Sequence, residues 1–418
     1  MRHLIIACLL FALIGAPWIV NNYPLQSQYI TDAIANIASQ LAAVIMHKPK
    51  TVAGLQSKYN ISATRGTDKI HILLVPGHEP NYGGAEYRDL KERDMNIELA
   101  NNLADILRNN NRYEVIVVRD DKSWLPELSK YFKDSWGEII EWKNLYKEEF
   151  LRLQSIVGTN STKPKVYHNS APNNVALRLY GITKWANEKD MDIVIHIHFN
   201  DNPGHSSNSP GDHSGFAIYV PEEQFANSTT TKTIAESIFQ RLAKYNAVSD
   251  LKGESEGVIE ESELIAIGVY NTSDAPSMLI EYGYIYEQQF ANESTRDLAI
   301  KDLAFQTYLG VQDFFGSGND YSLAYDTLML PYKWQREIKI NDGPSKDILA
   351  LQTALQSKGW YPPSSRSKND CPRTGTFGSC TKAALTEFQS KKGIKNENGI
   401  VGPKTLDALN IEYGNKVI

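Results

Sequence analysis

Short apolar runs separated by helical stretches characterise the chain from Lys69 to about Gly316. Most of these runs are apolar at every position, as in strands that are buried on both faces of a parallel sheet. The predicted strands are Ile70 to Val75, Val115 to Val118, Ile193 to Ile197, Phe216 to Val220 and Met278 to Ile280. Between them, apolar residues recur at helical spacing, for example at Leu99, Leu103, Ile106 and Leu107 and at Ile234, Ile238 and Leu242. The pattern predicts an α/β fold with an open, mostly parallel sheet flanked by helices.

Residues 121–170 interrupt this rhythm with charged residues and large aromatic side chains. The aromatic residues are Trp124, Phe132, Trp136, Trp142 and Phe150. We interpret the stretch as a helical insertion in a domain that spans residues 67–316. Packing on the surface of the domain is the favoured role, and a lid over an active site is the alternative. The Gly-, Ser- and Pro-rich loop from Asp201 to Ser214 is expected to shape substrate access.

The N-terminus combines a charged start with an apolar run from Leu4 to Val20, which is typical of an export signal. The small-residue cleavage site is poorly formed, because Pro17 directly follows Ala16. Residues 1–20 are therefore predicted to be a signal peptide or an uncleaved membrane anchor that uses residues 4–20. Cys8 fits best as a small apolar residue of this run. Residues 21–66 are expected to form a linker and an amphipathic helix, from about Gln28 to His47.

An internal repeat marks the C-terminal part of the chain, after a predicted linker at residues 317–343. Residues 375–385 and 399–409 both read Gly-x-apolar-Gly-x-x-Thr-x-x-Ala-Leu. Each half predicts a glycine turn that leads into a short helix, with the apolar third position and the final Leu buried together. A helix around Leu351 completes a small all-α, three-helix unit at residues 344–418. This doubled pattern resembles the peptidoglycan-binding domain of bacterial cell-wall hydrolases, which implies peptidoglycan as a partner.

The composition is that of a multidomain globular protein, with 418 residues, 42% hydrophobic and 22% charged. A net charge of -6 argues against a nucleic-acid partner, because phosphate recognition normally requires a strongly basic domain. Cys371 and Cys380 lie close together in a Gly-rich stretch, so an exported chain is expected to join them in a disulfide. Two free thiols are the alternative if the chain is not exported.

Candidate catalytic residues follow the predicted strands. His78 comes after the first strand through Pro76-Gly77, which places it at the carboxyl edge of the sheet, where open α/β folds bind ligands. Strand alternation puts His196 and His198 on one face, with His198 nearer the edge and better placed as a ligand. His196 then fits a hydrogen-bonded position behind it, because same-face histidines are costly to bury without partners.

Two carboxylates are predicted at the same edge. Glu92 precedes an amphipathic helix, with Glu86 as its competitor for the role of ligand, and Glu281 ends an apolar strand. Two imidazoles and one carboxylate can bind Zn²⁺ and leave a coordination position open for water. A second carboxylate can then accept the proton of that water, and Glu281 is placed to do so.

These segments together resemble the zinc-dependent N-acetylmuramoyl-L-alanine amidases of the family-3 type. The resemblance rests on four motifs in the family's order: Pro76-Gly77-His78, Glu92-Arg93-Asp94-Met95-Asn96, His196-Ile197-His198-Phe199-Asn200 and Pro276 through Gly283. It implies that His78, Glu92 and His198 bind zinc and that Glu281 is catalytic, with His196 and Asn200 behind the ligands or near the substrate. The chain departs from the family at Val75, at Glu79-Pro80 and at His196, but no departure removes a ligand.

The resemblance implies hydrolysis of the amide bond between N-acetylmuramic acid and the L-alanine of the stem peptide. We expect an enzyme of the bacterial cell envelope, secreted or anchored on the outer side of the cytoplasmic membrane. One alternative is a catalytically inactive scaffold or regulator that binds the wall, and another is a zinc peptidase that cuts within the stem peptide. The insertion also permits autoinhibition, as in gated relatives whose inserted helix covers the zinc. The residues predict no oligomeric state.

Overall fold

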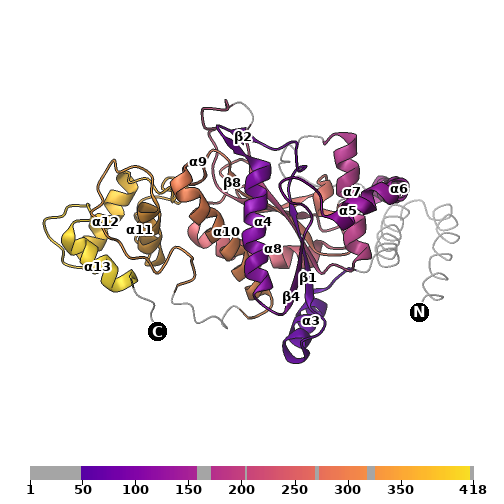
Figure 1. Ribbon diagram of the computed structural model, residues 1–418, viewed down its shortest axis with the longest axis horizontal. Helices are drawn as coiled ribbons and strands as arrows, with labels where there is room; N and C mark the ends of the chain where they lie inside the picture. The colour runs from indigo at the N-terminus through magenta and orange to yellow at the C-terminus, as the bar shows by residue number, and fades with distance from the viewer. Residues whose placement is uncertain (1–48, 158–170, 203–204, 269–272, 318–324, 415–418) are drawn as a thin grey trace, which may run out of the picture.

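The computed structural model describes residues 49–157, 171–202, 205–268, 273–317 and 325–414 (Figure 1). The predicted export segment and the helix expected at residues 28–47 lie outside these ranges. Within the described ranges, no helix has both the length and the apolar character needed to cross a membrane.

A six-stranded sheet organises the larger part of the molecule, in the order β4-β1-β5-β8-β6-β7. Its strands are β1 Ile70–Pro76, β4 Tyr113–Val117, β5 Ile193–Asn200, β6 Ala217–Pro221, β7 Val258–Glu261 and β8 Ser277–Tyr284. Neighbours from β4 to β8 run parallel, whereas β6 is antiparallel to β8 and carries β7 parallel to itself at the edge. The mostly parallel α/β sheet is therefore confirmed.

Successive residues of each strand face opposite helical layers. In β1, Ile72 and Leu74 join the core that contains α4, α8 and α10, and Leu73 and Val75 join the core that contains α5, α6 and α7. This two-sided burial is why the strand sequences are apolar throughout. The helices are α4 Glu92–Arg108, α8 Ser228–Tyr245, α10 Glu293–Phe314, α5 Pro126–Asp134, α6 Trp136–Val157 and α7 Asn173–Glu188.

The helix α3, Val52–Arg65, precedes the sheet and packs against it. Leu55 and Tyr59 are buried in the same core as α4 and α10. The hydroxyl of Tyr59 also donates to Gln312 Oε1 on α10 at 2.9 Å. Part of the segment predicted to be a helix and linker thus belongs to the core of the larger unit.

The described part of the insertion packs on one face of the sheet. Leu128 and Phe132 of α5 and Ile139 of α6 are buried in the core that contains α7. Residues 158–170 of the predicted insertion lie outside the described ranges. The surface-packing interpretation agrees with these contacts, and autoinhibition stays a prediction.

Three helices form the C-terminal unit, which lies at one end of the long axis beside α10 and the short helix α9, Gln288–Ala291 (Figure 1). They are α11 Lys346–Ser357, α12 Ser379–Lys391 and α13 Pro403–Tyr413. The apolar third position and the final Leu of each repeat, Phe377 with Leu385 and Val401 with Leu409, have exposed fractions of 1% or less. The predicted all-α unit and its buried repeat are confirmed.

A glutamine from the preceding helix closes each repeat. Gln352 Oε1 accepts a hydrogen bond from Gly375 N at 2.9 Å, and Gln389 Oε1 accepts one from Gly399 N at 2.7 Å. Both glycines have a positive φ, 73° and 79°, which a residue with a side chain rarely adopts. The repeat in the sequence is thus a repeated local structure.

The core of the C-terminal unit extends beyond the three helices. Trp334 and Ile338, which lie in the stretch predicted as a linker, are buried in it, and Ile338 pairs with Val401 in an isolated bridge. Cys371 and Cys380 form a disulfide, as predicted.

Candidate active site

His78 reaches the sheet edge on a tight turn after β1. Its backbone has a φ of 69°, in the left-handed region that residues with side chains seldom occupy. Gly77 lets this turn pass His198, because a Cβ on Gly77 would lie 2.2 Å from His198 Cε1. The glycine is therefore needed for the two imidazoles to approach each other.

Arg119 donates hydrogen bonds to backbone carbonyls of the same turn. This side chain is only 3% exposed, and its Nε donates to Pro76 O at 3.1 Å. Its second terminal nitrogen donates to Gly77 O and, at 3.0 Å, to Arg93 O at the start of α4. Burial lowers the pKa of Arg119 to about 10, which still leaves the guanidinium charged at neutral pH.

Glu92 is the first residue of α4 and is 4% exposed. Its Oε2 accepts a hydrogen bond from Ala85 N at 2.9 Å. Its Oε1 accepts from Phe199 N and from Asn96 Nδ2, both at 3.3 Å. Because these donors fix both oxygens, the carboxylate is held in one orientation.

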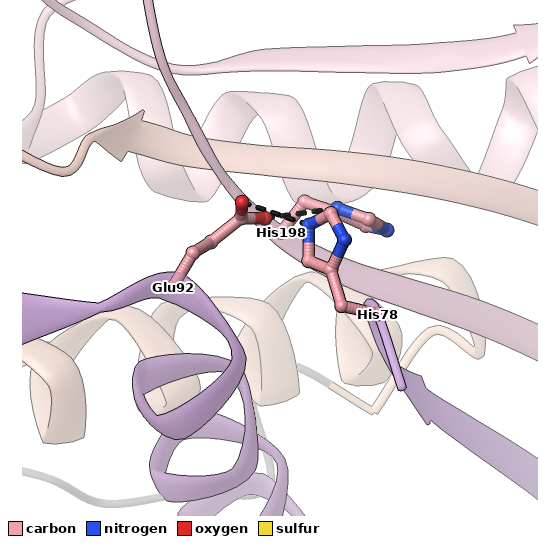
Figure 2. A group of neighbouring side chains, drawn as sticks. All are labelled: His78, Glu92 and His198. Atoms are coloured by element: carbon pink, nitrogen blue, oxygen red, sulfur yellow. Dashed lines mark hydrogen bonds and ion pairs between the residues drawn. The ribbon is translucent and has the colours of Figure 1, made fainter. Parts of the chain in front are cut away.

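The three side chains converge (Figure 2). Glu92 Oε2 lies 2.8 Å from His78 Nε2, and Glu92 Oε1 lies 3.0 Å from His198 Nδ1. One ligand atom from each residue falls within 4.8 Å of the other two. Burial alone would raise the pKa of Glu92, but the two histidines lower it below its ordinary value of 4.5. Burial lowers the pKa of His198, which favours the neutral, metal-binding form.

Glu86, the competing carboxylate, lies away from this group. It is exposed in β2, Glu86–Tyr87, which pairs with β3, Leu90–Lys91, in a short hairpin. Its Oε1 accepts a hydrogen bond from Arg93 at 3.2 Å. The structure therefore brings Glu92, and not Glu86, to the histidines.

Glu281 lies beside the group in the neighbouring strand. β5 and β8 are parallel and pair His198 with Glu281 in register. Glu281 Oε2 is buried and has no hydrogen-bond partner among the described residues. Burial raises the pKa of Glu281 well above its ordinary value of 4.5, and the charges of Glu92 and Glu254 raise it further. A carboxyl with a raised pKa next to a ligand group is suited to proton transfer.

Comparison with known proteins identifies the family. The profile described as N-acetylmuramoyl-L-alanine amidase matches residues 72–313, which include all of the sheet except the first two residues of β1, and all four of these residues. The chain belongs to this amidase family. It is an N-acetylmuramoyl-L-alanine amidase, a cell-wall hydrolase. A second profile, described as a putative peptidoglycan binding domain, matches residues 344–409.

Solved structures similar to the amidase include the CwlD amidase of Clostridioides difficile in complex with the GerS lipoprotein. That match has 16% identity and a TM-score of 0.39, and it covers 59% of this chain and 99% of that one. The Ami1 amidase of Mycobacterium smegmatis matches with 14% identity and a TM-score of 0.39, covering 59% of this chain and 97% of that one. No curated protein matches the chain.

The two residues expected behind the ligands lie outside the group of three. His196 of the amidase is 2% exposed, and burial lowers its pKa to about 3, so the imidazole is uncharged. Asn200 ends β5, and its Nδ2 donates to Glu254 Oε1 at 3.1 Å.

Sequence reasoning missed Glu254, which is 1% exposed. Its carboxylate also accepts hydrogen bonds from the hydroxyls of Tyr219, Ser249 and Tyr284. In the sequence it stands in a Glu- and Gly-rich stretch that reads as an exposed loop. No local signal indicates its burial, because Asn200, Tyr219 and Tyr284 come from distant strands and only Ser249 is near it in the sequence.

The departure from the family at Glu79 also has a structural role in this amidase. Glu79 Oε1 accepts a hydrogen bond from Arg178 Nε of α7 at 2.7 Å, and Oε2 accepts one from Trp124 Nε1 at 3.2 Å. The start of the insertion and α7 thus both form hydrogen bonds with Glu79, the residue that follows His78.

Proposed function

We propose that the amidase binds Zn²⁺ through His78, Glu92 and His198 and uses Glu281 as its general base. Two imidazole nitrogens and one carboxylate oxygen are a donor set typical of catalytic zinc. His78 Nε2 supports this assignment: it is buried 2.8 Å from Glu92 Oε2, yet makes no hydrogen bond of acceptable geometry among the described residues. The hydrogen bonds that fix Glu92 fit the requirement that ligands be held by their neighbours.

Zinc at this position would supply Lewis acidity, lowering the pKa of a water molecule to about 7 and polarising the scissile carbonyl. Glu281 Oε2 would accept a proton from the attacking water and pass it to the nitrogen of the leaving L-alanine. Its raised pKa supports both transfers, because the carboxyl must hold the proton between them. Arg119 and Gly77 would keep His78 and His198 in place.

The substrate proposed for this site is the amide that joins N-acetylmuramic acid to the stem peptide in peptidoglycan. We assign residues 67–316 to catalysis and residues 344–418 to wall binding. The family match and the peptidoglycan-binding match support a site of action outside the cytoplasm. Export through residues 1–20, by cleavage or as an anchor, is part of this proposal, and fractionation of cells that produce the full chain tests it.

Replacement of Glu281 tests the mechanism. Glu281→Gln keeps the size of the side chain but removes the base, so hydrolysis of purified peptidoglycan should fall by about 10²–10⁴-fold while bound zinc is retained. Glu86→Gln is the matched control, because this carboxylate is exposed and outside the group. Near-normal hydrolysis by Glu281→Gln would show that the base is wrongly assigned.

Mass spectrometry of the released fragments tests the reaction itself. The proposal requires intact stem peptides with a free L-alanine amine and glycan strands whose muramic acid residues carry free lactyl carboxylates. Fragments cut within the stem would identify a peptidase instead. A protein that pellets with the wall and releases nothing would identify an inactive scaffold.

A further inference from the structure

A cavity of about 520 Å³ lies between the catalytic and C-terminal units. The catalytic unit contributes the loop around His213 and the segment that carries α9, Gln288–Ala291. The C-terminal unit contributes Pro344, Thr374 and Thr376. The volume is within the range of about 300–1,000 Å³ that is usual for binding pockets. Neither unit forms the pocket alone.

Buried contacts hold the two units in one arrangement. Arg373 of the C-terminal unit is 8% exposed and makes an ion pair with Asp302 of α10 at 3.3 Å. Its Nε donates to Tyr245 O at 3.0 Å, and a terminal nitrogen donates to Asn246 Oδ1 at 3.2 Å. Separation of the two units would break the buried ion pair between Arg373 and Asp302, which opposes their movement apart.

The pocket walls also meet directly. Thr376 Oγ1 donates to Gln288 Oε1 at 3.0 Å, and Ser294 Oγ donates to Pro344 O at 2.9 Å. These bonds join the two units at the cavity itself, so its shape is set by the docking of the units.

The pocket is connected to the active site by a short piece of chain. Tyr87 at the end of β2 and Arg88 in the turn of the β2–β3 hairpin line the pocket, and β3 leads directly into α4 at Glu92. Arg88 N donates to Ser207 O at 2.7 Å, which fixes the turn to the loop after β5. Arg88 of the lining and Glu92 are four residues apart, and four residues of chain span at most about 14 Å.

The lining is rich in uncharged polar groups. These are Ser214, Gln288, Gln289, Asn292, Thr374 and Thr376. Gln289 Nε2 donates to Glu287 Oε2 at 2.7 Å, and Tyr286, 4% exposed, adds an aromatic ring to the lining. The amides and hydroxyls of the lining can donate to and accept from a ligand.

Apart from the tyrosines, four side chains of the lining are charged or titratable: Arg88 and Asp212 are exposed, and Glu287 and His213 have partners within the protein. Glu287 accepts hydrogen bonds from Gly215 N at 3.0 Å and Tyr284 N at 2.8 Å, and His213 Nδ1 lies 3.0 Å from Asp250 Oδ1. Hydroxyl and acetamido groups on a ring match amide and hydroxyl side chains above an aromatic wall. A stem peptide, with its carboxylates and amine, would meet only Arg88 and Asp212 as charges outside these pairs, among six uncharged polar side chains.

We propose that this pocket binds a sugar unit of the glycan strand, next to the muramic acid whose amide is cut. The proposal rests on the function proposed above, because it names the part of peptidoglycan that the pocket takes. It makes the C-terminal unit one wall of a substrate site as well as an anchor.

Two substitutions that fill the cavity test the proposal, one from each unit. Pro210→Trp and Thr374→Trp place a bulky ring in the lining, and Ser390→Trp places the same ring on an exposed position of α12 as the control. The full chain is titrated calorimetrically with a peptide-free glycan tetrasaccharide and with free stem peptide. Hydrolysis is measured on polymeric peptidoglycan and on a single N-acetylmuramoyl peptide, and melting temperatures check the fold.

Each filling variant should weaken tetrasaccharide binding by about tenfold or more and raise KM for the polymer. Turnover of the single N-acetylmuramoyl peptide should stay at the wild-type level, as should all properties of Ser390→Trp. Unchanged tetrasaccharide binding in both filling variants overturns the proposal, as does a loss confined to stem-peptide binding. An equal loss on both substrates in both variants also overturns it. Failure of the wild type to release stem peptides is a different result and refutes the proposed function.

Discussion

Gly77→Ala should remove metal binding while leaving the fold in place. The new Cβ would lie 2.2, 2.4 and 2.6 Å from Cε1, Nε2 and Nδ1 of His198. Ordinary contact begins at 3.4 Å, so the imidazole has to move by about 1 Å. The backbone cannot easily move instead, because Arg119 holds the carbonyls of Pro76 and Gly77.

A displacement of that size is large for a ligand, because metal–ligand distances are kept to within about 0.2 Å. Changes to residues that merely support a ligand already reduce metal affinity by about 10–100-fold. We therefore expect Gly77→Ala to weaken zinc binding by at least about 100-fold. Crowding at one buried contact should cost about 1–3 kcal/mol of folding free energy, which a domain of this size can tolerate.

The assay is a titration of the metal-free full chain with Zn²⁺ in competition with a chromogenic chelator. Circular dichroism and thermal melting of the same samples report the fold. Gly137→Ala is the control, because a Cβ on Gly137 of α6 meets nothing within 4 Å. Zinc affinity at the wild-type level in a folded Gly77→Ala variant would refute the claim that His198 needs this close approach.

Two further predictions concern stability. Because the pKa of Glu281 is raised, the metal-free folded chain keeps a proton that the unfolded chain releases above pH 4.5. The free energy of unfolding therefore falls as the pH rises from 4.5 through the raised pKa. Glu281→Gln should accordingly raise the melting temperature of the metal-free protein at about pH 7 and change it little near pH 4; an identical melting temperature at neutral pH contradicts the cause given. Arg373→Leu should destabilise the chain by about 3–5 kcal/mol, because it leaves Asp302, 1% exposed, without its partner. Arg336→Leu removes an arginine from exposed ion pairs and should cost under about 1 kcal/mol, so equal effects in denaturant unfolding would refute the difference in burial.

The main strands could be predicted because burial on both faces makes them apolar throughout. β7 escaped prediction, since its four residues include Glu260 and Glu261. So did the β2–β3 hairpin, in which each strand has two residues. Trp334 and Ile338 looked like part of a polar linker because the residues around them are polar, and their burial depends on contacts with the distant helix α13 and Val401.

The candidate site was predictable where position along a strand decides it. His78 follows β1, and His198 and Glu281 lie in the carboxyl-terminal halves of the parallel strands β5 and β8, so one side of the sheet had to collect them. Glu92 needed the family motif to be preferred over Glu86, because both are carboxylates close to the start of the same helix. The burial of Glu254 could not be predicted from the sequence, since most of its hydrogen-bond partners lie in distant strands.

The contacts of Arg373 also bear on where along a polymer the enzyme cuts. A binding unit on a flexible tether lets a catalytic centre sample every bond within the tether's reach. Here the C-terminal unit is fastened to α10, which itself packs against α4, the helix that begins with Glu92. The position where the C-terminal unit binds the wall and the bond that is cut are then separated by one fixed distance. When few enzyme molecules are bound to the wall, the cleaved amides should therefore lie at one fixed distance from the positions where the C-terminal units bind.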